Sequence, residues 1–120
     1  MKVLIVDDVF IIRKHIENTL KSIDLVIISE ASNGIEAISQ AHIHDPDVVI
    51  LDLNMPILNG VEALPILRKA LPEALIITMS SEDNQAPLIE SLKMGADKYL
   101  TKPLSHFQIS EAMKISNLYS

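Results

Sequence analysis

Residues 48–60 read VVILDLNMPILNG, and they show a pattern that the rest of the chain repeats. The stretch opens with four apolar, mostly β-branched residues at 48–51, which is typical of a strand buried on both faces of a parallel sheet. Asp52 follows where the apolar run ends, and Asn59-Gly60 supplies a turn before the next helix. Ligands collect at the carboxyl ends of the strands in open α/β sheets. Asp52 is therefore a candidate site residue.

Apolar runs and amphipathic segments alternate along the whole chain. The runs predict five strands, and apolar residues recurring every three or four positions predict a helix after each strand. Pro65 falls inside the third helix, where it removes a backbone hydrogen bond and is expected to cause a kink. The alternation implies a parallel sheet covered on both faces by right-handed crossovers. The expected strands are 3–6, 25–28, 48–51, 74–79 and 98–100, and the expected helices lie at 9–20, around 35–41, 61–71 and 88–92, and at about 104–118.

The composition excludes several classes of function. The 120 residues are expected to form one domain spanning 1–120, with 48% hydrophobic residues and no linker or repeat. The absence of cysteine excludes disulfides, thiol catalysis and cysteine-ligated zinc. A net charge of −6 and 3% aromatic residues argue against nucleic-acid binding, and three glycines cannot form a dinucleotide fingerprint or a P-loop. No apolar run suits a signal peptide or a membrane span, so we expect a soluble, cytoplasmic protein.

Polar side chains stand at the ends of four expected strands. Asp7 and Asp8 follow the first strand, Asp52 the third, Ser80 the fourth and Lys102 the fifth. These ends lie on one edge of a parallel sheet, so the side chains can converge. Three neighbouring carboxylates repel one another and raise at least one pKa, unless a cation lies between them. Oxygen ligands suit Mg²⁺, and without cysteine or a strand-end histidine a softer metal is not expected.

This set of groups suits phosphoryl transfer to Asp52. Carboxylates act as nucleophiles when aspartyl phosphates form. A metal ion, the Lys102 ammonium and the Ser80 hydroxyl can then each interact with one phosphoryl oxygen. Because phosphoryl transfer depends mostly on positioning and charge neutralisation, these groups are chemically sufficient.

Four motifs together closely resemble the response-regulator receiver domain of two-component signalling. They are DD after the first strand, D-x-N-M-P…G after the third, a hydroxyl after the fourth and K-P after the fifth. The resemblance covers essentially the whole chain, and the combination of motifs is highly specific. It implies a flavodoxin-like α/β fold, in which a doubly wound five-stranded sheet of order 2-1-3-4-5 carries five helices on its two faces.

The resemblance also implies roles for the site residues. Asp52 looks like the phosphoacceptor. Asp7 and Asp8 look like the Mg²⁺-binding acids, together with Asp52 and helped by the backbone carbonyl of Asn54. Lys102 looks like the phosphate-sensing lysine, and its bond to the following proline is similar to the cis peptide of the family.

Ser80 and Tyr99 look like the switch pair of the family. Two features differ from its usual pattern or vary within it. Ser81 stands where the family usually has alanine, which can alter access to the phosphoryl group. Asn54 and Glu82 occupy variable positions that tune the phosphoryl lifetime in the family, so the lifetime is not predicted.

The implied function is a phosphorylation-dependent switch rather than an enzyme, with slow autodephosphorylation. A sensor histidine kinase or a phosphotransfer protein would donate to Asp52, and the surface at about 84–118 would change its affinity for a downstream protein target or an output domain. Direct binding of nucleic acid or membrane by this chain is not expected. The cognate kinase, dimerisation on phosphorylation, and a stand-alone or multidomain arrangement are left open.

Three rival functions, and plainer roles for single residues, account for parts of the pattern. Phosphatases of the haloacid dehalogenase type need a second acid where Asn54 stands, and a flavodoxin needs a hydroxyl-rich loop in place of Asp7-Asp8. A phosphorylation-independent interaction module stays open. Asp8 alone can cap the first helix, and Tyr99 alone can be a packing residue. His15 and His106 are expected on helix surfaces, and His42 and His44 are not expected to bind a metal. The methionines Met55, Met79, Met94 and Met113 are expected in the core.

Overall fold

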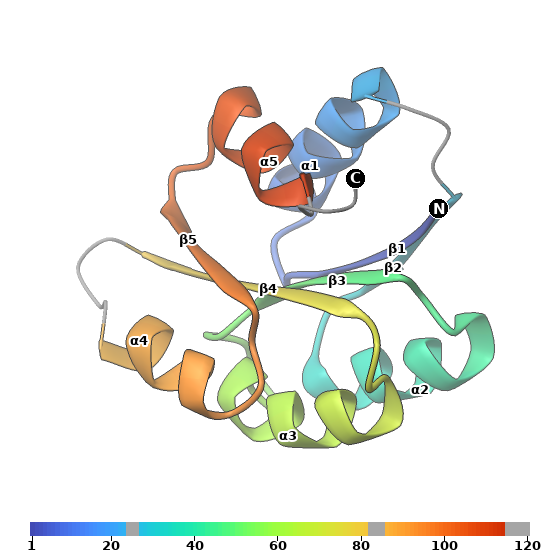
Figure 1. The fold of residues 1–120 in the computed structure, drawn as a ribbon, viewed down its shortest axis with the longest axis vertical. Coiled ribbons are helices and arrows are strands. Elements are labelled where there is room, and N and C mark those ends of the chain that lie inside the picture. Colours follow the sequence, from blue (N-terminus) through green and yellow to red (C-terminus); the bar gives the residue numbers. More distant parts are fainter. Residues whose placement is uncertain (24–26, 82–85, 115–120) are drawn as a thin grey trace.

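The computed structural model describes residues 1–23, 27–81 and 86–114, and strands and helices alternate strictly along them (Figure 1). This alternation is the one that the hydrophobic pattern predicted. The strands are β1 (Lys2–Val6), β2 (Ile27–Ala31), β3 (Val48–Asp52), β4 (Leu75–Ser81) and β5 (Lys98–Lys102). The helices are α1 (Phe10–Ile23), α2 (Gly34–His44), α3 (Gly60–Ala70), α4 (Ala86–Lys93) and α5 (His106–Met113).

The strands form a single parallel sheet of order β2-β1-β3-β4-β5, which confirms the predicted fold class. Figure 1 shows α1 and α5 on one face of this sheet and α2, α3 and α4 on the other. β1 pairs with both β2 and β3, so the winding direction of the chain reverses at β1. The carboxyl ends of β1 and β3 therefore lie side by side, in the position where open α/β sheets bind their ligands.

The core consists of two layers, one on each face of the sheet. In β1, Leu4 and Val6 pack with α2 and α3, whereas Val3 and Ile5 pack with α1 and α5. All residues of β3 are buried, which explains why its sequence is a continuous apolar run rather than an alternating one. Each fully buried Leu or Ile side chain contributes about 1.5–3 kcal/mol of hydrophobic stabilisation. The two strands whose ends carry the candidate acids are thus buried in the core.

Several element boundaries differ from the prediction. β2 runs to Ala31 through two polar residues, whereas the expected strand 25–28 begins at residues outside the described ranges. β4 and β5 extend to Ser81 and Lys102, because the ladder continues through the pairs Ser80↔Thr101 and Ser81↔Lys102. Backbone pairing between neighbouring strands, rather than hydrophobicity, fixes these ends. Ser80 and Lys102 consequently stand on strands and not in loops.

Side-chain caps define the starts of α3 and α5. Asn59 and Glu62 form a capping box at α3, and α3 is continuous through Pro65 to Ala70. α5 begins after the Ser105 capping box, rather than at 104, and ends at Met113. The expected continuation of this helix over 115–118 lies outside the described residues. Among the helices of the described ranges, none combines the length and the apolar character needed to cross a membrane.

The two histidines predicted to be at helix surfaces meet at the contact between α1 and α5. His15 Nε2 donates to the carbonyl oxygen of Leu104 over 2.8 Å, and His106 Nδ1 lies 2.7 Å from Thr19 Oγ1. The two rings meet edge to face, with centroids 5.1 Å apart. The surface prediction is confirmed for His106, which is exposed, whereas His15 is partly buried. Helical periodicity does not reveal that α5 packs against the face of α1 that carries His15. The methionine prediction is confirmed, since Met55, Met79 and Met113 are buried and Met94 packs partly buried against the core.

Candidate functional site

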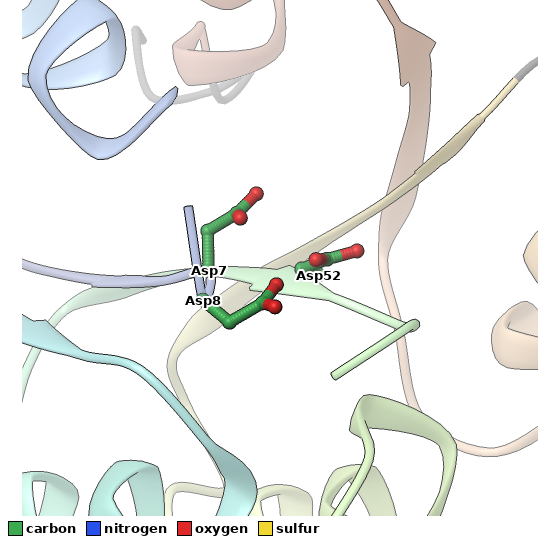
Figure 2. A group of neighbouring side chains, drawn as sticks. All are labelled: Asp7, Asp8 and Asp52. Atoms are coloured by element: carbon green, nitrogen blue, oxygen red, sulfur yellow. The ribbon is translucent and has the colours of Figure 1, made fainter. Parts of the chain in front are cut away.

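Three carboxylates meet at the carboxyl ends of β1 and β3 (Figure 2). Asp7 directly follows β1, Asp8 is the next residue, and Asp52 is the last residue of β3. One carboxylate oxygen from each lies within 4.8 Å of the other two. Asp7 and Asp52 are buried, with exposed fractions of 0% and 2%, whereas Asp8 is exposed. The parallel pairing Val6↔Leu51 brings the two buried acids side by side at the sheet edge.

Backbone hydrogen bonds hold the two buried acids in place. The Asp7 N–H donates to the carbonyl oxygen of Ala31 over 3.1 Å, and Asp7 Oδ1 accepts from the Val9 N–H at 2.9 Å. Asp52 Oδ1 accepts from the Asn54 N–H at 3.1 Å. The turn after β1 is therefore fastened by Asp7. Among the described residues no capping bond from Asp8 to α1 is present, so the plainer role considered for Asp8 is not supported.

Gly60, at the start of α3, lies against the backbone of Asp52. A Cβ atom at this position would stand 2.1 Å from the Asp52 carbonyl oxygen, which no side chain can occupy without moving the backbone. The Gly60 N–H also donates to the Leu53 carbonyl oxygen over 3.2 Å. Close approach of α3 to the end of β3 thus requires glycine here. The sequence indicated only a turn at this position.

Lys102 brings a positive charge from β5 to the two buried acids. Its Nζ lies 2.7 Å from Asp7 Oδ2 and 3.4 Å from Asp52 Oδ2, and 20% of its side chain is exposed. Burial by itself lowers the pKa of Lys102, but the hydrogen bond to Asp7 and the charges of both acids outweigh burial and raise it. Lys102 is therefore firmly protonated in this site. Its peptide bond to Pro103 is cis, as the resemblance implied.

The surroundings of Asp52 raise its pKa in spite of Lys102. Burial raises the pKa of Asp52 to about 6, and the negative charge of Asp7 adds to this shift. Lys102 and the Asn54 N–H lower the pKa but do not compensate fully. When all three carboxylates are ionised, the single lysine leaves two negative charges without a partner. An all-oxygen cluster with this charge fits a hard divalent cation such as Mg²⁺.

Ser80 and Asn54 lie at the side of the acidic cluster and are linked to each other. Ser80 is completely buried, and its Oγ accepts from Asn54 Nδ2 at 2.9 Å. The hydroxyl hydrogen of Ser80 remains available to donate elsewhere. The sequence indicated a role for the Asn54 backbone carbonyl and for Asn54 as a variable position, but it did not reveal this contact between the Asn54 and Ser80 side chains. The adjacency of β3 and β4 was the signal that could have suggested it.

Tyr99 is the predicted site residue that the structure leaves apart from the cluster. Tyr99 on β5 is 38% exposed, and its register partner is Thr78, not Ser80. Within the described ranges the Tyr99 side chain makes no hydrogen bond, and the residue is held through the backbone pairing of β4 and β5. Ser81 is exposed at the end of β4, whereas Glu82 lies outside the described residues. The structure therefore brings together Asp7, Asp8, Asp52 and Lys102, with Asn54 connecting Asp52 to Ser80.

Comparison with known proteins identifies the same domain by sequence and by structure. The model of the response regulator receiver domain matches residues 3–114. The chemotaxis protein CheY of Listeria monocytogenes is 35% identical over 114 residues, which are 95% of this chain and 96% of that protein. The nitrate/nitrite response regulator NarL of Escherichia coli is 34% identical, over 92% of this chain and 52% of NarL.

Two solved structures of bacterial regulators superpose closely on this fold. The receiver domain of the Francisella response regulator 1452 has a TM-score of 0.81 at 35% identity, with 92% of each chain covered. CheY from Borrelia burgdorferi, solved in a complex described as CheX-CheY-BeF3-Mg²⁺, has a TM-score of 0.87 at 28% identity, covering 93% of this chain and 85% of that one.

The acidic cluster at the ends of β1 and β3 is of the type that receiver domains use for Mg²⁺. Domains of this family are phosphoacceptor switches rather than enzymes, and each implies a kinase as partner. The sequence matches over nearly the full chain agree with the motifs, the sheet order and the acidic cluster. The chain therefore belongs to the response regulator receiver domain family.

Proposed function

We propose that Asp52 is the residue that accepts the phosphoryl group and that a sensor histidine kinase or a phosphotransfer protein donates it. The observation that carries this proposal is the convergence of three carboxylates within 4.8 Å beside Lys102 at one sheet edge. An Asp52 carboxylate oxygen attacks the phosphorus of a phosphohistidine. The new O–P bond replaces the N–P bond, and the histidine nitrogen leaves with its electron pair and takes a proton from water.

Each neighbouring residue has a distinct task in this reaction. Asp7, Asp8 and Asp52, with the Asn54 backbone carbonyl, would hold Mg²⁺, which when bound neutralises phosphoryl oxygens and lowers the repulsion between the acids. Lys102 moves its charge from Asp7 towards a phosphoryl oxygen, within reach of its present position 3.4 Å from Asp52. The Ser80 hydroxyl, oriented by Asn54, donates to another phosphoryl oxygen. The relative from Borrelia burgdorferi was solved with BeF3 and Mg²⁺, which supports this choice of cation.

The output of the domain is a change in its surface. The phosphoryl group draws Ser80 inward, and Tyr99 follows into the space that Ser80 leaves. Ser80 and Tyr99 thus form the switch pair, and the surface of α4, β5 and α5 changes its affinity for a downstream protein or for an output domain. The expected surface, 84–118, includes residues 84–85 and 115–118, which lie outside the described ranges. The change is a shift between two packings, driven by contacts available in only one of them.

The proposal also covers the setting in which the domain works. The receiver domain would occupy residues 1–120 and function in the cytoplasm, either alone or joined to an output domain, with dimerisation on phosphorylation as a further mode of output. The relatives include both arrangements, since CheY is matched over 96% of its length and NarL over 52%. Binding of nucleic acid by this domain itself is not expected at a net charge of −6.

The test is the intact mass of the protein after incubation with acetyl phosphate, with and without Mg²⁺. Wild type is expected to gain one phosphoryl group in a Mg²⁺-dependent manner, and Asp52→Asn to gain none. Samples taken over seconds to minutes guard against an adduct that hydrolyses quickly. Absence of an adduct in wild type at every time point would favour a phosphorylation-independent interaction module instead.

A further inference from the structure

Arg13 on α1 connects the backbone of the acidic segment to the neighbouring strand β2. Its Nη1 donates to the Asp7 carbonyl oxygen over 2.7 Å, and its Nε donates to Glu30 Oε1 over 2.8 Å. The guanidinium carbon lies 5.6 Å from the centroid of the Phe10 ring, and 15% of the Arg13 side chain is exposed. These three contacts from different directions hold the guanidinium in one position.

The Asp7 carbonyl belongs to the peptide group that joins Asp7 to Asp8. On the other side of Asp7, its N–H donates to the carbonyl oxygen of Ala31 on β2. Both backbone polar groups of Asp7 are therefore fixed, and the direction in which Asp8 leaves the strand is fixed with them. Lys102 pairs with Asp7 and Asp52 but not with Asp8, so the backbone is what places the exposed Asp8 carboxylate.

We propose that Arg13, held by Glu30, is a positioning residue that orients the Asp7-Asp8 segment for binding the divalent cation. Glu30 neutralises the guanidinium, so Arg13 acts through its hydrogen bond to the Asp7 carbonyl without placing an unpaired positive charge near the cation. Groups that orient metal ligands from outside the coordination sphere typically change metal affinity by about 10–100-fold when removed. This inference rests on the proposed function, in which Asp7 and Asp8 hold Mg²⁺.

Arg68 offers a matched control for an arginine that only supports the fold. Its guanidinium donates to the carbonyl oxygens of Gly95, Leu71 and Ala74, and it pairs with Asp97 at 3.1 Å. Like Arg13, it is a partly buried guanidinium bound to backbone carbonyls. Its contacts lie in the loops that precede β4 and β5, at the end of the sheet opposite the acidic cluster. Loss of Arg68 therefore lowers stability without touching the cation site.

The experiment is a Mg²⁺ titration followed by amide chemical shifts in NMR spectra, on wild type, Arg13→Met, Arg13→Lys and Arg68→Met. Thermal unfolding of each variant is recorded in parallel. Arg13→Met is expected to raise the Kd for Mg²⁺ roughly tenfold. Arg13→Lys keeps the charge but cannot reach both the Asp7 carbonyl and Glu30, so its Kd should lie in between. Arg68→Met is expected to lower the Tm while the Kd stays at the wild-type value.

Phosphorylation by acetyl phosphate supplies a second readout. For Arg13→Met, the labelling rate should fall at low Mg²⁺ and recover at saturating Mg²⁺. A wild-type Kd in Arg13→Met, or an equal loss of affinity in Arg68→Met, would overturn the inference while leaving the proposed function intact. If Arg13→Met does not fold, a wild-type Kd in Arg13→Lys overturns it. A wild type that neither binds Mg²⁺ nor accepts a phosphoryl group would refute the proposed function itself.

Discussion

Asparagine in place of Asp52 removes a buried charge while keeping nearly the same shape. The amide oxygen of Asn can still accept from the Asn54 N–H, and Lys102 keeps its shorter contact with Asp7. The pKa of Asp52 is raised from 3.8 to about 6 in the folded protein. The folded protein binds this proton more tightly than the unfolded chain, so Asp52 contributes to stability at low pH. That contribution to the free energy of unfolding is lost as the pH rises through about 6. Above that pH the ionised carboxylate destabilises the native state.

The raised pKa of Asp52 sets the size of the stability difference between Asp52→Asn and wild type. A difference of about two pKa units corresponds to roughly 3 kcal/mol at 1.36 kcal/mol per unit. For a domain of 120 residues, this is a Tm difference of about 12 °C. Asp52→Asn should thus be more stable than wild type by about 3 kcal/mol at pH 8 without metal, and the gain should vanish near pH 4. Mg²⁺ should stabilise wild type and have little effect on the variant.

Chemical and thermal unfolding at pH 4, 6 and 8, with EDTA or with Mg²⁺, measures this difference. Asp8→Asn is the matched control, because it removes one charge from the same cluster but from an exposed side chain, and a smaller gain is expected. If Asp52→Asn is no more stable than wild type at pH 8 without metal, the Asp52 carboxylate does not destabilise the native state and the prediction is refuted. A gain that does not depend on pH would refute it too.

Three further substitutions test other parts of the site. Lys102→Ala leaves two buried acids without their cation, so the free energy of unfolding of the metal-free protein should fall by about 3 kcal/mol at pH 8. Asp52 should still accept a phosphoryl group, but phosphorylation should change hydrogen exchange over α4, β5 and α5 only weakly. A change as large as in wild type would exclude Lys102 from the switch. Ser80→Ala removes the acceptor for the Asn54 side chain, which should lower the free energy of unfolding in denaturant by about 1 kcal/mol. Asp52 should still be phosphorylated, but without the change in hydrogen exchange over α4, β5 and α5. A change as large as in wild type would contradict the switch role of Ser80. Gly60→Ala should lower the free energy of unfolding by about 1–3 kcal/mol and slow phosphorylation by acetyl phosphate, because the new Cβ would collide with the Asp52 backbone. A wild-type Tm and a wild-type phosphorylation rate would show that close approach at this position does not require glycine.

The sequence predicted the fold well where hydrophobicity alone determines structure. β3 is a continuous apolar run because both faces are covered, and Asp52 marks the point at which burial of apolar residues ends. The boundaries of β2 were missed because Ser29 and Glu30 are paired through their backbone, and their side chains gave no strand signal. Backbone pairing likewise extended β4 and β5 beyond their apolar segments.

The convergence of the three acids and Lys102 was predictable from topology alone, because the carboxyl ends of parallel strands lie on one edge of the sheet. Contacts between side chains from different elements could not be predicted in this way. The Asn54–Ser80 hydrogen bond and the His15–His106 contact each join residues far apart in sequence. Such contacts depend on helix packing and on rotamers, which leave no periodic trace in the sequence.

The central claim, that Asp52 carries the phosphoryl group, can be tested most directly by locating the modified residue. After labelling with acetyl phosphate and Mg²⁺, borohydride reduces an acyl phosphate to the corresponding alcohol, and peptide mass spectrometry then identifies the position. Reduction is expected at Asp52 in wild type and at no aspartate in Asp52→Asn. Reduction at Asp7 or Asp8 in wild type, or at another aspartate in the variant, would contradict the account.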